Sequence, residues 1–335
     1  MDVLRVVHEF LAWSTEARNS WVAHGHPVVH CSWSPDGTQI LSCSADSTVK
    51  VWDTNGNVRH TLKHTRLVKR CCFSPGGETI LSCSWDKTLK LWDSITGECK
   101  KTLRGHSEWV NDACFSKDGN VILSCSSDGM IGLMSGRDGG GPIITIITVR
   151  IFLLPGSLKL WNAMTGECKH TILKNEENSD YCNCVSFSPN GAYFLGGFEI
   201  FSALQLWDAT SHDSLRIFHG HIGGVTACCF DKTGRIVLSA SKDKTIKLWH
   251  VDTGQCFNTL IGHCGSIFAA CFSNSGNEII SASPDGKMLA LWKTKTGALI
   301  RIVDHGSPAR CCSFSSDGKL VAGVSDGHLV LWRHP

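Results

Sequence analysis

The stretch His64–Asp93, HTRLVKRCCFSPGGETILSCSWDKTLKLWD, decides the fold of this chain. It has a histidine at its start, an aromatic residue nine positions later, an aspartate after 22 positions and a tryptophan six positions further on. A polar pattern that recurs every forty-odd residues predicts a repeat protein. Histidines nine residues before an aromatic residue occur in six places: His24, His64, His106, His221, His263 and His305.

The stretch also predicts β-strands. Apolar and polar residues alternate within it in three runs, and glycine-containing turns separate the runs, because glycine supplies the positive φ angle that such turns require. A Thr-Gly turn then precedes a fourth run. The strands expected in this unit span residues 68–74, 79–84, 88–92 and 99–103.

Four antiparallel strands in about 40 residues cannot bury both of their faces, so neighbouring sheets must stack around an axis. Seven such units fill the 335 residues of the chain. We therefore expect an all-β fold, a seven-bladed β-propeller of four-stranded antiparallel blades over residues 19–335. The last unit has no fourth strand of its own, and the segment 19–23 is expected to close it. Residues 1–18 form an N-terminal extension with apolar residues at helical spacing.

The Gly105-His106 and Trp92-Asp93 pairs are where the chain resembles the WD-repeat family of β-propellers, and the resemblance covers residues 20–332. It implies that the aspartate bonds the loop histidine, the histidine bonds a hydroxyl on the second strand, and that hydroxyl accepts the tryptophan N–H. Serines lie both four and two residues before the aspartate, as Ser82 and Ser84 do, and the sequence leaves this choice open. With the first choice, the implied structural tetrads are His24, Ser42, Asp46 and Trp52; His64, Ser82, Asp86 and Trp92; His106, Ser124, Asp128 and Trp161; His221, Ser239, Asp243 and Trp249; His263, Ser281, Asp285 and Trp292; and the incomplete set His305, Asp326 and Trp332.

The repetition argues against two other interpretations of these histidines. A catalytic Ser-His-Asp triad needs no copies at five symmetric places. His24, His26 and His30 include the residue type of a zinc site, but His24 belongs to the first tetrad and the chain has no C-x-x-C pair. We therefore predict a protein that is not an enzyme and holds no metal or cofactor.

Charge and cysteine content restrict the partners and the compartment. The 32 basic and 30 acidic residues give a net charge of +2 without a basic run, which argues against nucleic acid as a partner. No apolar stretch reaches the ~20 residues of a membrane helix. The 18 cysteines follow the repeat rather than a pairing scheme, which indicates free thiols in a reducing compartment, cytoplasmic or nuclear.

Two units depart from the pattern. In unit three Trp161 follows Asp128 by 33 residues instead of six, and removal of residues 130–156 restores the usual spacing. This insertion is either a retained intron or gene-model error, or a loop that covers the partner-binding face. Unit four has Asn178 in place of the histidine and Phe201 in place of the aspartate, so we expect it to be the least stable blade.

The resemblance also implies where partners bind. In propellers of this family, partners contact the residues three and five positions after the histidine and the residue before the aspartate, all on one face. Four aromatic residues stand at such positions here although the repeat does not need them, and aromatic anchors within a polar rim are typical of protein interfaces. The predicted partner-binding residues are Leu67, Lys69, Trp85, Trp109, Asn111, Tyr181, Asn183, Lys242, Phe268 and Arg310.

These residues predict a non-catalytic interaction scaffold or adaptor, either a monomeric propeller or part of a larger complex. Its partner is expected to be a protein or peptide with apolar anchors and acidic groups. The cysteine-rich strands, as in Cys71-Cys72 and Cys83, are also similar to propellers of the apoptotic protease-activating factor group. That likeness implies an alternative, a sensor propeller that restrains a larger signalling ATPase, which requires further sequence upstream because the chain has no phosphate-binding loop. An enzymatic or nucleic-acid-associated propeller has no motif to support it.

If residues 130–156 are a retained intron, most transcripts of the gene will lack the 27 corresponding codons. Sequencing of reverse-transcribed messages across codons 129 and 157 measures the proportion of the two forms. A segment present in most messages contradicts the intron interpretation and favours the loop.

Overall fold

The computed structural model of the chain describes residues 19–106, 108–127, 130–135, 137–138, 141–142, 146–150, 158–161, 168–172, 181–304, 307–315, 318–324 and 327–333. The helix expected within residues 1–18 lies outside them, as do Asp128, Asn178, His305 and Asp326. All the regular elements in the described part of the chain are strands. This part contains no helix long and apolar enough to cross a membrane.

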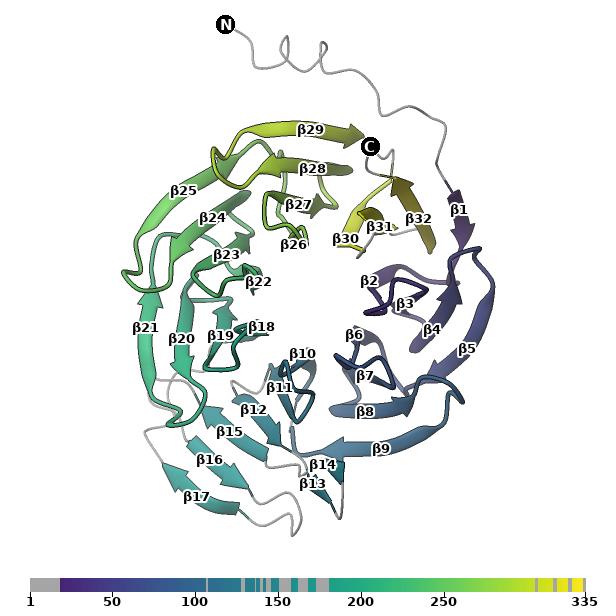
Figure 1. Cartoon of the computed structure of the whole chain (residues 1–335), viewed down its shortest axis with the longest axis vertical. Helices are drawn as coiled ribbons and strands as arrows, with labels where there is room; N and C mark the ends of the chain where they lie inside the picture. The colour runs from purple at the N-terminus through teal and green to yellow at the C-terminus, as the bar shows by residue number, and fades with distance from the viewer. Residues whose placement is uncertain are drawn as a thin grey trace, which may run out of the picture.

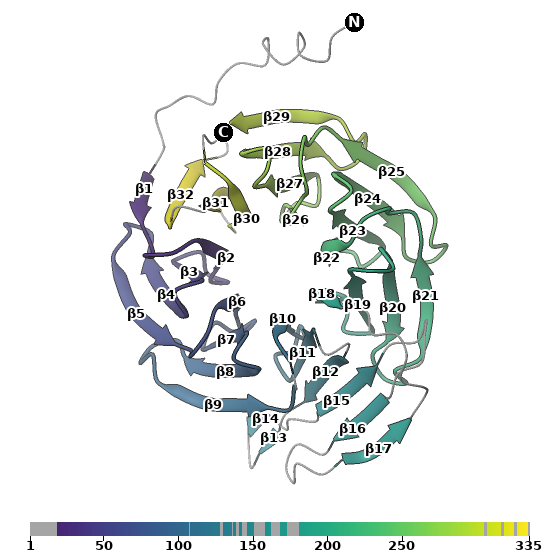
Figure 2. The same cartoon turned by 180° about the vertical axis from the view of Figure 1, so that it is seen from behind.

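The described strands form antiparallel sheets that lie side by side in a ring around a central opening (Figures 1 and 2). Within the described residues, six of these sheets have four strands and one has six. The first strand of each unit borders the opening and the last lies at the periphery of the ring. The prediction of an all-β propeller with four-stranded antiparallel blades is confirmed, and each blade takes the number of its sequence unit below.

The regular blades share one strand order, from the central opening outward. Their strands are β2 (Val28–Trp33), β3 (Gln39–Ser44), β4 (Thr48–Asp53) and β5 (Val58–Lys63) in blade one; β6 (Val68–Phe73), β7 (Thr79–Ser84), β8 (Thr88–Asp93) and β9 (Cys99–Arg104) in blade two; β18 (Cys182–Phe187), β19 (Tyr193–Phe198), β20 (Leu204–Asp208) and β21 (Ser214–Phe218) in blade four; β22 (Val225–Phe230), β23 (Ile236–Ser241), β24 (Thr245–His250) and β25 (Cys256–Ile261) in blade five; and β26 (Ala269–Phe272), β27 (Glu278–Ser283), β28 (Met288–Lys293) and β29 (Leu299–Asp304) in blade six.

The two ends of the chain share blade seven. β1 (Asn19–Val22) pairs antiparallel with β32 (His328–Arg333), outside β31 (Lys319–Val324) and β30 (Ala309–Phe314). The backbone N–H groups of Ala23 and His24 then donate to the carbonyl of Gly327, at N···O distances of 2.8 and 3.0 Å. The segment that leads into blade one therefore supplies the outer strand of blade seven.

Blade three differs from the prediction in the order of its strands. The sequence predicts that Leu158–Trp161 follows the Asp128 turn directly, but the residues that come straight after this turn form β12 and pair with β11, with Ser124 opposite Gly132. A tight turn joins neighbouring strands, so β12 takes the third position. Trp161 lies two strands further out, roughly 10 Å from the position that a tetrad with Ser124 requires. The sheet consists of β10 (Val110–Phe115), β11 (Val121–Ser126), β12 (Met130–Ser135), β15 (Ile146–Arg150), β16 (Leu158–Trp161) and β17 (Cys168–Ile172), while β13 (Arg137–Asp138) pairs with β14 (Gly141–Pro142).

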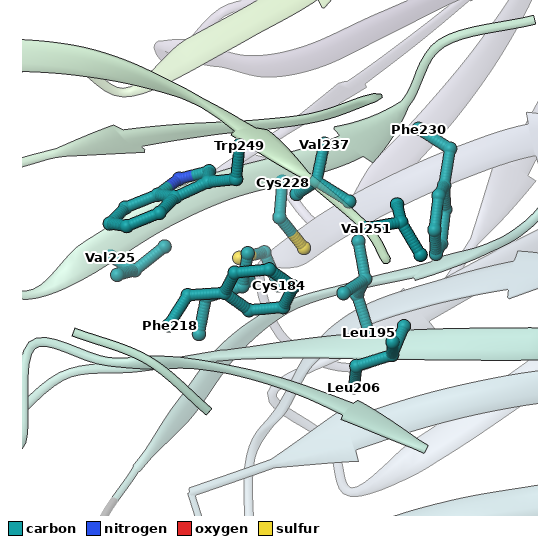
Figure 3. Packing of buried hydrophobic residues seen from close by; sticks show 11 residues of the cluster. Cys184, Leu195, Leu206, Phe218, Val225, Cys228, Phe230, Val237, Trp249 and Val251 are labelled. Atoms are coloured by element: carbon teal, nitrogen blue, oxygen red, sulfur yellow. The ribbon is translucent and has the colours of Figure 1, made fainter. Parts of the chain in front are cut away.

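The core of the protein lies between adjacent blades. The second strand of each regular blade is buried along nearly its whole length, because both of its faces meet neighbouring sheets. Figure 3 shows one such joint, in which Leu195, Leu206 and Phe218 of blade four form one cluster with Val237 and Trp249 of blade five, and Phe218 meets Trp249 edge to face. Burial of one large apolar side chain contributes about 1.5–3 kcal/mol, so these joints are the main source of stability.

Blade four replaces the polar tetrad with aromatic packing. Trp207 stacks on Phe194, with a centroid distance of 5.2 Å, and meets Phe198 edge to face. Gly196 stands opposite Gln205, where blades one, two and five have a serine opposite a lysine. The indole of Trp207 therefore has no serine hydroxyl on β19 to donate to.

We expect the amides of β19 in blade four to exchange with deuterium roughly 30-fold faster than those of β7 in blade two. Blade four lacks the two hydrogen bonds through the serine, each worth about 1 kcal/mol. Native-state hydrogen exchange read by mass spectrometry measures both strands in one sample. Equal protection of β19 and β7 would show that the aromatic packing compensates fully for the missing bonds.

Candidate functional site

The tetrad of blade two is a continuous chain of buried hydrogen bonds. The indole Nε1 of Trp92 donates to Ser82 Oγ at 2.8 Å, and Ser82 Oγ lies 2.7 Å from Nε2 of His64. His64 Nδ1 lies 2.8 Å from the Asp86 carboxylate. Because the carboxylate only accepts, the proton of the neutral imidazole is on Nδ1, and Nε2 accepts from the serine hydroxyl. The chain ties the histidine loop to the second and third strands.

Blades one and five contain the same chain, and the geometry decides which serine takes part. The serine four residues before the aspartate bonds the histidine and the indole, at 2.7–2.8 Å. Ser84, two residues before the aspartate, instead accepts from the backbone N–H of Asp86 and donates to the carbonyl of Arg66. The complete chains consist of His24, Ser42, Asp46 and Trp52 in blade one and His221, Ser239, Asp243 and Trp249 in blade five.

The tetrad also fixes the charge state of its members. Burial lowers the pKa of His64, although the hydrogen bond to Asp86 acts in the opposite direction. Burial tends to raise the pKa of Asp86, but hydrogen bonds from Thr88 and His64 bring it down to about 2. Near neutral pH the blade therefore contains a neutral imidazole bound to a carboxylate.

The other tetrads are incomplete. In blade three His106 Nε2 lies 2.8 Å from Ser124 Oγ, while Asp128 lies outside the described residues. In blade six Ser281 binds His263 and Trp292, but His263 Nδ1 is buried without a hydrogen-bond partner and the predicted bond to Asp285 is wrong. The sequence carried a signal of this change, because Trp292 follows Asp285 by seven residues instead of six. The longer turn leaves Asp285 bound to the backbone N–H of Ser266.

A β-bulge explains why the residue five positions after the histidine is available to partners. In six blades the pairing between the first and second strands skips one residue near the start of the first strand. A bulge of this kind leaves the extra residue unpaired and re-aims its side chain. The skipped residues are Val29, Lys69, Asn111, Asn183, Thr226 and Arg310, and all of them line the central cavity.

This cavity, of about 890 Å³, brings together nearly all of the predicted partner-binding residues. Leu67 does not line it, but its carbonyl accepts from the backbone N–H of Trp85 at 3.0 Å. The same bond joins the equivalent residues of blades three, four and five and thereby places the two loop positions side by side. The predicted residues that line the cavity are Lys69, Trp85, Trp109, Asn111, Tyr181, Asn183, Lys242, Phe268 and Arg310.

The aromatic residues form a platform at the rim of the cavity. Trp85 of blade two stacks on Trp109 of blade three, with ring centroids 4.3 Å apart and the planes within 11°. Trp109 and Tyr181 remain exposed, at 38% and 43% of their surface. Part of this aromatic surface thus serves to pack the rings on each other, and part is open to a ligand.

Some polar residues of the cavity are bound within the protein, and others have no acceptor there. Asn111 and Asn183 use their amide N–H groups to bind backbone carbonyls of the next blade, at 3.0 Å in both cases. Lys242 forms an ion pair with Glu199. Neither Lys69 nor Arg310 Nε has an acceptor among the described residues, and the guanidinium of Arg310 lies 5.8 Å from the ring centroid of Phe268. Burial lowers the pKa of Lys69, and the charge of Arg310 acts in the same direction.

The sequence did not predict a buried ion pair beside the cavity, of which Arg70 lines the wall. Arg70 Nε lies 3.0 Å from the carboxylate of Asp112, which also accepts from the backbone N–H groups of Ala113 and Val185. Asp112 is 1% exposed, and its contacts join blades two, three and four. The signal was that two opposite charges occupy equivalent positions of adjacent units.

Comparison with known protein families agrees with this geometry. The family model of the WD domain, G-beta repeat, matches seven segments of the chain: residues 17–53, 56–93, 97–133, 166–203, 212–250, 254–292 and 297–333. The chain belongs to the WD-repeat family. The third match runs to residue 133, so the family pattern, like the structure, takes the start of β12 as the third strand of blade three.

Several curated proteins resemble parts of this WD-repeat chain. It is 30% identical over 90 residues to Pre-mRNA-processing factor 19 homolog 2 of Arabidopsis thaliana, which is 27% of this chain and 17% of that protein. It is 40% identical over 47 residues to the WD repeat-containing protein WDS homolog of the same plant, 14% and 9% of the two chains. With WD repeat, SAM and U-box domain-containing protein 1 of Danio rerio it shares 25% identity over 162 residues, 47% and 24% of the two chains. Each alignment thus covers less than a quarter of the relative.

The pH dependence of stability offers a test of the open tetrad in blade six. Burial lowers the pKa of His263 from 6.5 to about 4, with no carboxylate to oppose it. Below pH 6.5 only the unfolded chain binds this proton, so the wild type loses stability as the pH falls toward 4. The variant His263→Gln has no such group, so its unfolding free energy does not carry this loss. We therefore expect the difference in unfolding free energy between the wild type and the variant to decrease by up to about 3 kcal/mol between pH 7 and pH 4.

Urea unfolding at a series of pH values measures this difference. His64→Gln is the matched control, since Asp86 opposes the lowering of the pKa of His64 and its deficit should shrink less. Parallel pH profiles for the wild type and His263→Gln would contradict the assignment.

Proposed function

We propose that this WD-repeat chain is a non-catalytic interaction scaffold, a seven-bladed propeller that binds a protein or peptide over the mouth of its central cavity. The observation that carries the proposal is the gathering of nine predicted residues around one cavity, although they come from six different blades. Binding surfaces of this kind combine a cluster of aromatic anchors with a polar rim.

The chemistry of the cavity suggests the chemistry of the partner. The open surfaces of Trp109 and Tyr181 favour an apolar or aromatic side chain. The Nε of Arg310 is buried without an acceptor among the described residues, which is costly for a cationic donor, and the half-buried Lys69 lines the same cavity. We infer that the partner places a carboxylate between blades seven and two and an apolar anchor on the platform of blades two to four.

The relatives and the cysteines support two further parts of the proposal. One relative combines WD repeats with SAM and U-box domains, so a WD-repeat propeller can serve there beside domains of other kinds. No disulfide joins the cysteines of the described residues, which agrees with a reducing compartment, the cytoplasm or the nucleus. The proposed role here is that of the binding module.

Affinity capture with the full chain tests the face. The double variant Trp85→Ala with Trp109→Ala should lose roughly 30-fold or more in affinity for its specific partners, because anchor residues typically contribute 2 kcal/mol or more. Lys69→Gln with Arg310→Gln should weaken the same partners and reduce the salt dependence of binding.

The matched control is Ile95→Ala, which removes an exposed apolar residue, 81% accessible, from the turns at the opposite end of blade two. Quantitative mass spectrometry compares the proteins captured by each variant, and circular dichroism verifies that each variant is folded. An identical set of partners for the wild type and the tryptophan variant would contradict the proposed face.

A further inference from the structure

We propose that His30, Cys43 and Cys71 form a Zn²⁺ site at the joint of blades one and two. One ligand atom from each residue, the imidazole nitrogen or the thiol sulfur, lies within 4.8 Å of the other two. Zinc bound to two cysteines and a histidine has metal–ligand distances of about 2.0–2.3 Å, so its ligand atoms are less than 5 Å apart. The three groups are therefore close enough to bind one ion after a small contraction.

The backbone brings these residues together from two blades. His30 follows the β-bulge of β2 and stands directly opposite Cys43 in β3. Cys71 comes from β6, the innermost strand of the next blade. Cys43 and Cys71 are 0% and 1% exposed, whereas His30 lines the central cavity. The site thus lies behind the cavity wall, and the imidazole is its contact with the cavity.

The orientation of the imidazole fits a metal ligand. Nδ1 of His30 is buried without a hydrogen-bond partner in the described structure. Burial lowers the pKa of His30, and the ring also lies near the backbone carbonyl of Cys71, which acts to raise this pKa. A buried ring nitrogen without a hydrogen-bond partner has a lone pair available to a metal ion, and metal-bound histidines commonly use their second nitrogen for a hydrogen bond to a nearby carbonyl.

The repeat itself does not require these residues. Arg70, Asp112, Cys184, Ala227 and Cys311 occupy the position of His30 in other blades. In blade two the full set becomes Arg70, Cys83 and Ala113, which cannot bind zinc. The histidine and the two thiols thus coincide at one joint only among these blades.

Charge and coordination number favour zinc. Two thiolates balance Zn²⁺, so the occupied site is neutral, and Lys69 and Arg70 nearby do not repel it. Burial raises the pKa of Cys71, so binding must release its proton, as for other thiolate sites. Three protein ligands leave a fourth position for water, which is the pattern of zinc sites that accept an exogenous ligand.

Metal titration of the reduced full chain tests the site. Co²⁺ serves as the probe, because thiolate-bound tetrahedral Co²⁺ gives charge-transfer and ligand-field bands, and Zn²⁺ should abolish them by displacement. We expect one equivalent of Co²⁺ in the wild type. Cys43→Ser, Cys71→Ser and His30→Gln should each lose more affinity than the 10- to 100-fold that removal of an outer hydrogen-bond partner typically costs.

Cys83→Ser is the matched control, since Cys83 has the place of Cys43 one blade further on. It should bind Co²⁺ and Zn²⁺ like the wild type, and X-ray absorption of the zinc form should give two sulfur ligands. His30→Gln keeps both thiols and tests the site even if a cysteine variant does not fold. Unchanged binding in His30→Gln, equal losses in Cys83→Ser and Cys43→Ser, or no thiolate–Co²⁺ bands in the wild type would each overturn the proposal.

Discussion

The chain of hydrogen bonds from tryptophan through serine and histidine to aspartate is the interaction on which blades one, two and five depend. In blade two it passes from Trp92 to Asp86 through Ser82 and His64, with every link between 2.7 and 2.8 Å. All its members are directional, so a strand that slips by one residue breaks the whole chain. The hydrophobic joints between blades supply most of the stability, but they are less selective about register. The chain therefore determines where the loops lie, and the loops hold the candidate binding residues.

Much of the fold was predictable because the units of the repeat can be compared with each other position by position. A spacing that recurs from His64–Asp93 to other units identifies strands, turns and buried polar residues together. The same comparison predicted the aromatic and cationic residues of the cavity, since Trp85 and Lys69 stand out only against their equivalents. The choice between Ser82 and Ser84 was not predictable, because both face the core and only the position of the imidazole separates them.

The remaining features depend on contacts between units, to which the repeat gives no guide. Blade three shows this within one sheet: Leu158–Trp161 has the same sequence, LKLW, as the middle of β8, yet Met130–Ser135 takes the third position because it follows the turn directly. Across blades, Arg70 pairs with Asp112, and Cys71 meets His30 and Cys43. Each of these residues looks ordinary within its own unit. Only the angle between two sheets brings them together.

The β-bulge in the first strand connects stability with binding. It turns one side chain toward the cavity in each of six blades, and what that side chain contacts decides its role. Asn111 and Asn183 reach carbonyls of the next blade and close the joint. Lys69 has no acceptor among the described residues, and burial lowers its pKa. A bulge residue that hydrogen-bonds to the next blade stabilises the ring, whereas one without an acceptor in its own chain leaves a polar group that a partner can bind.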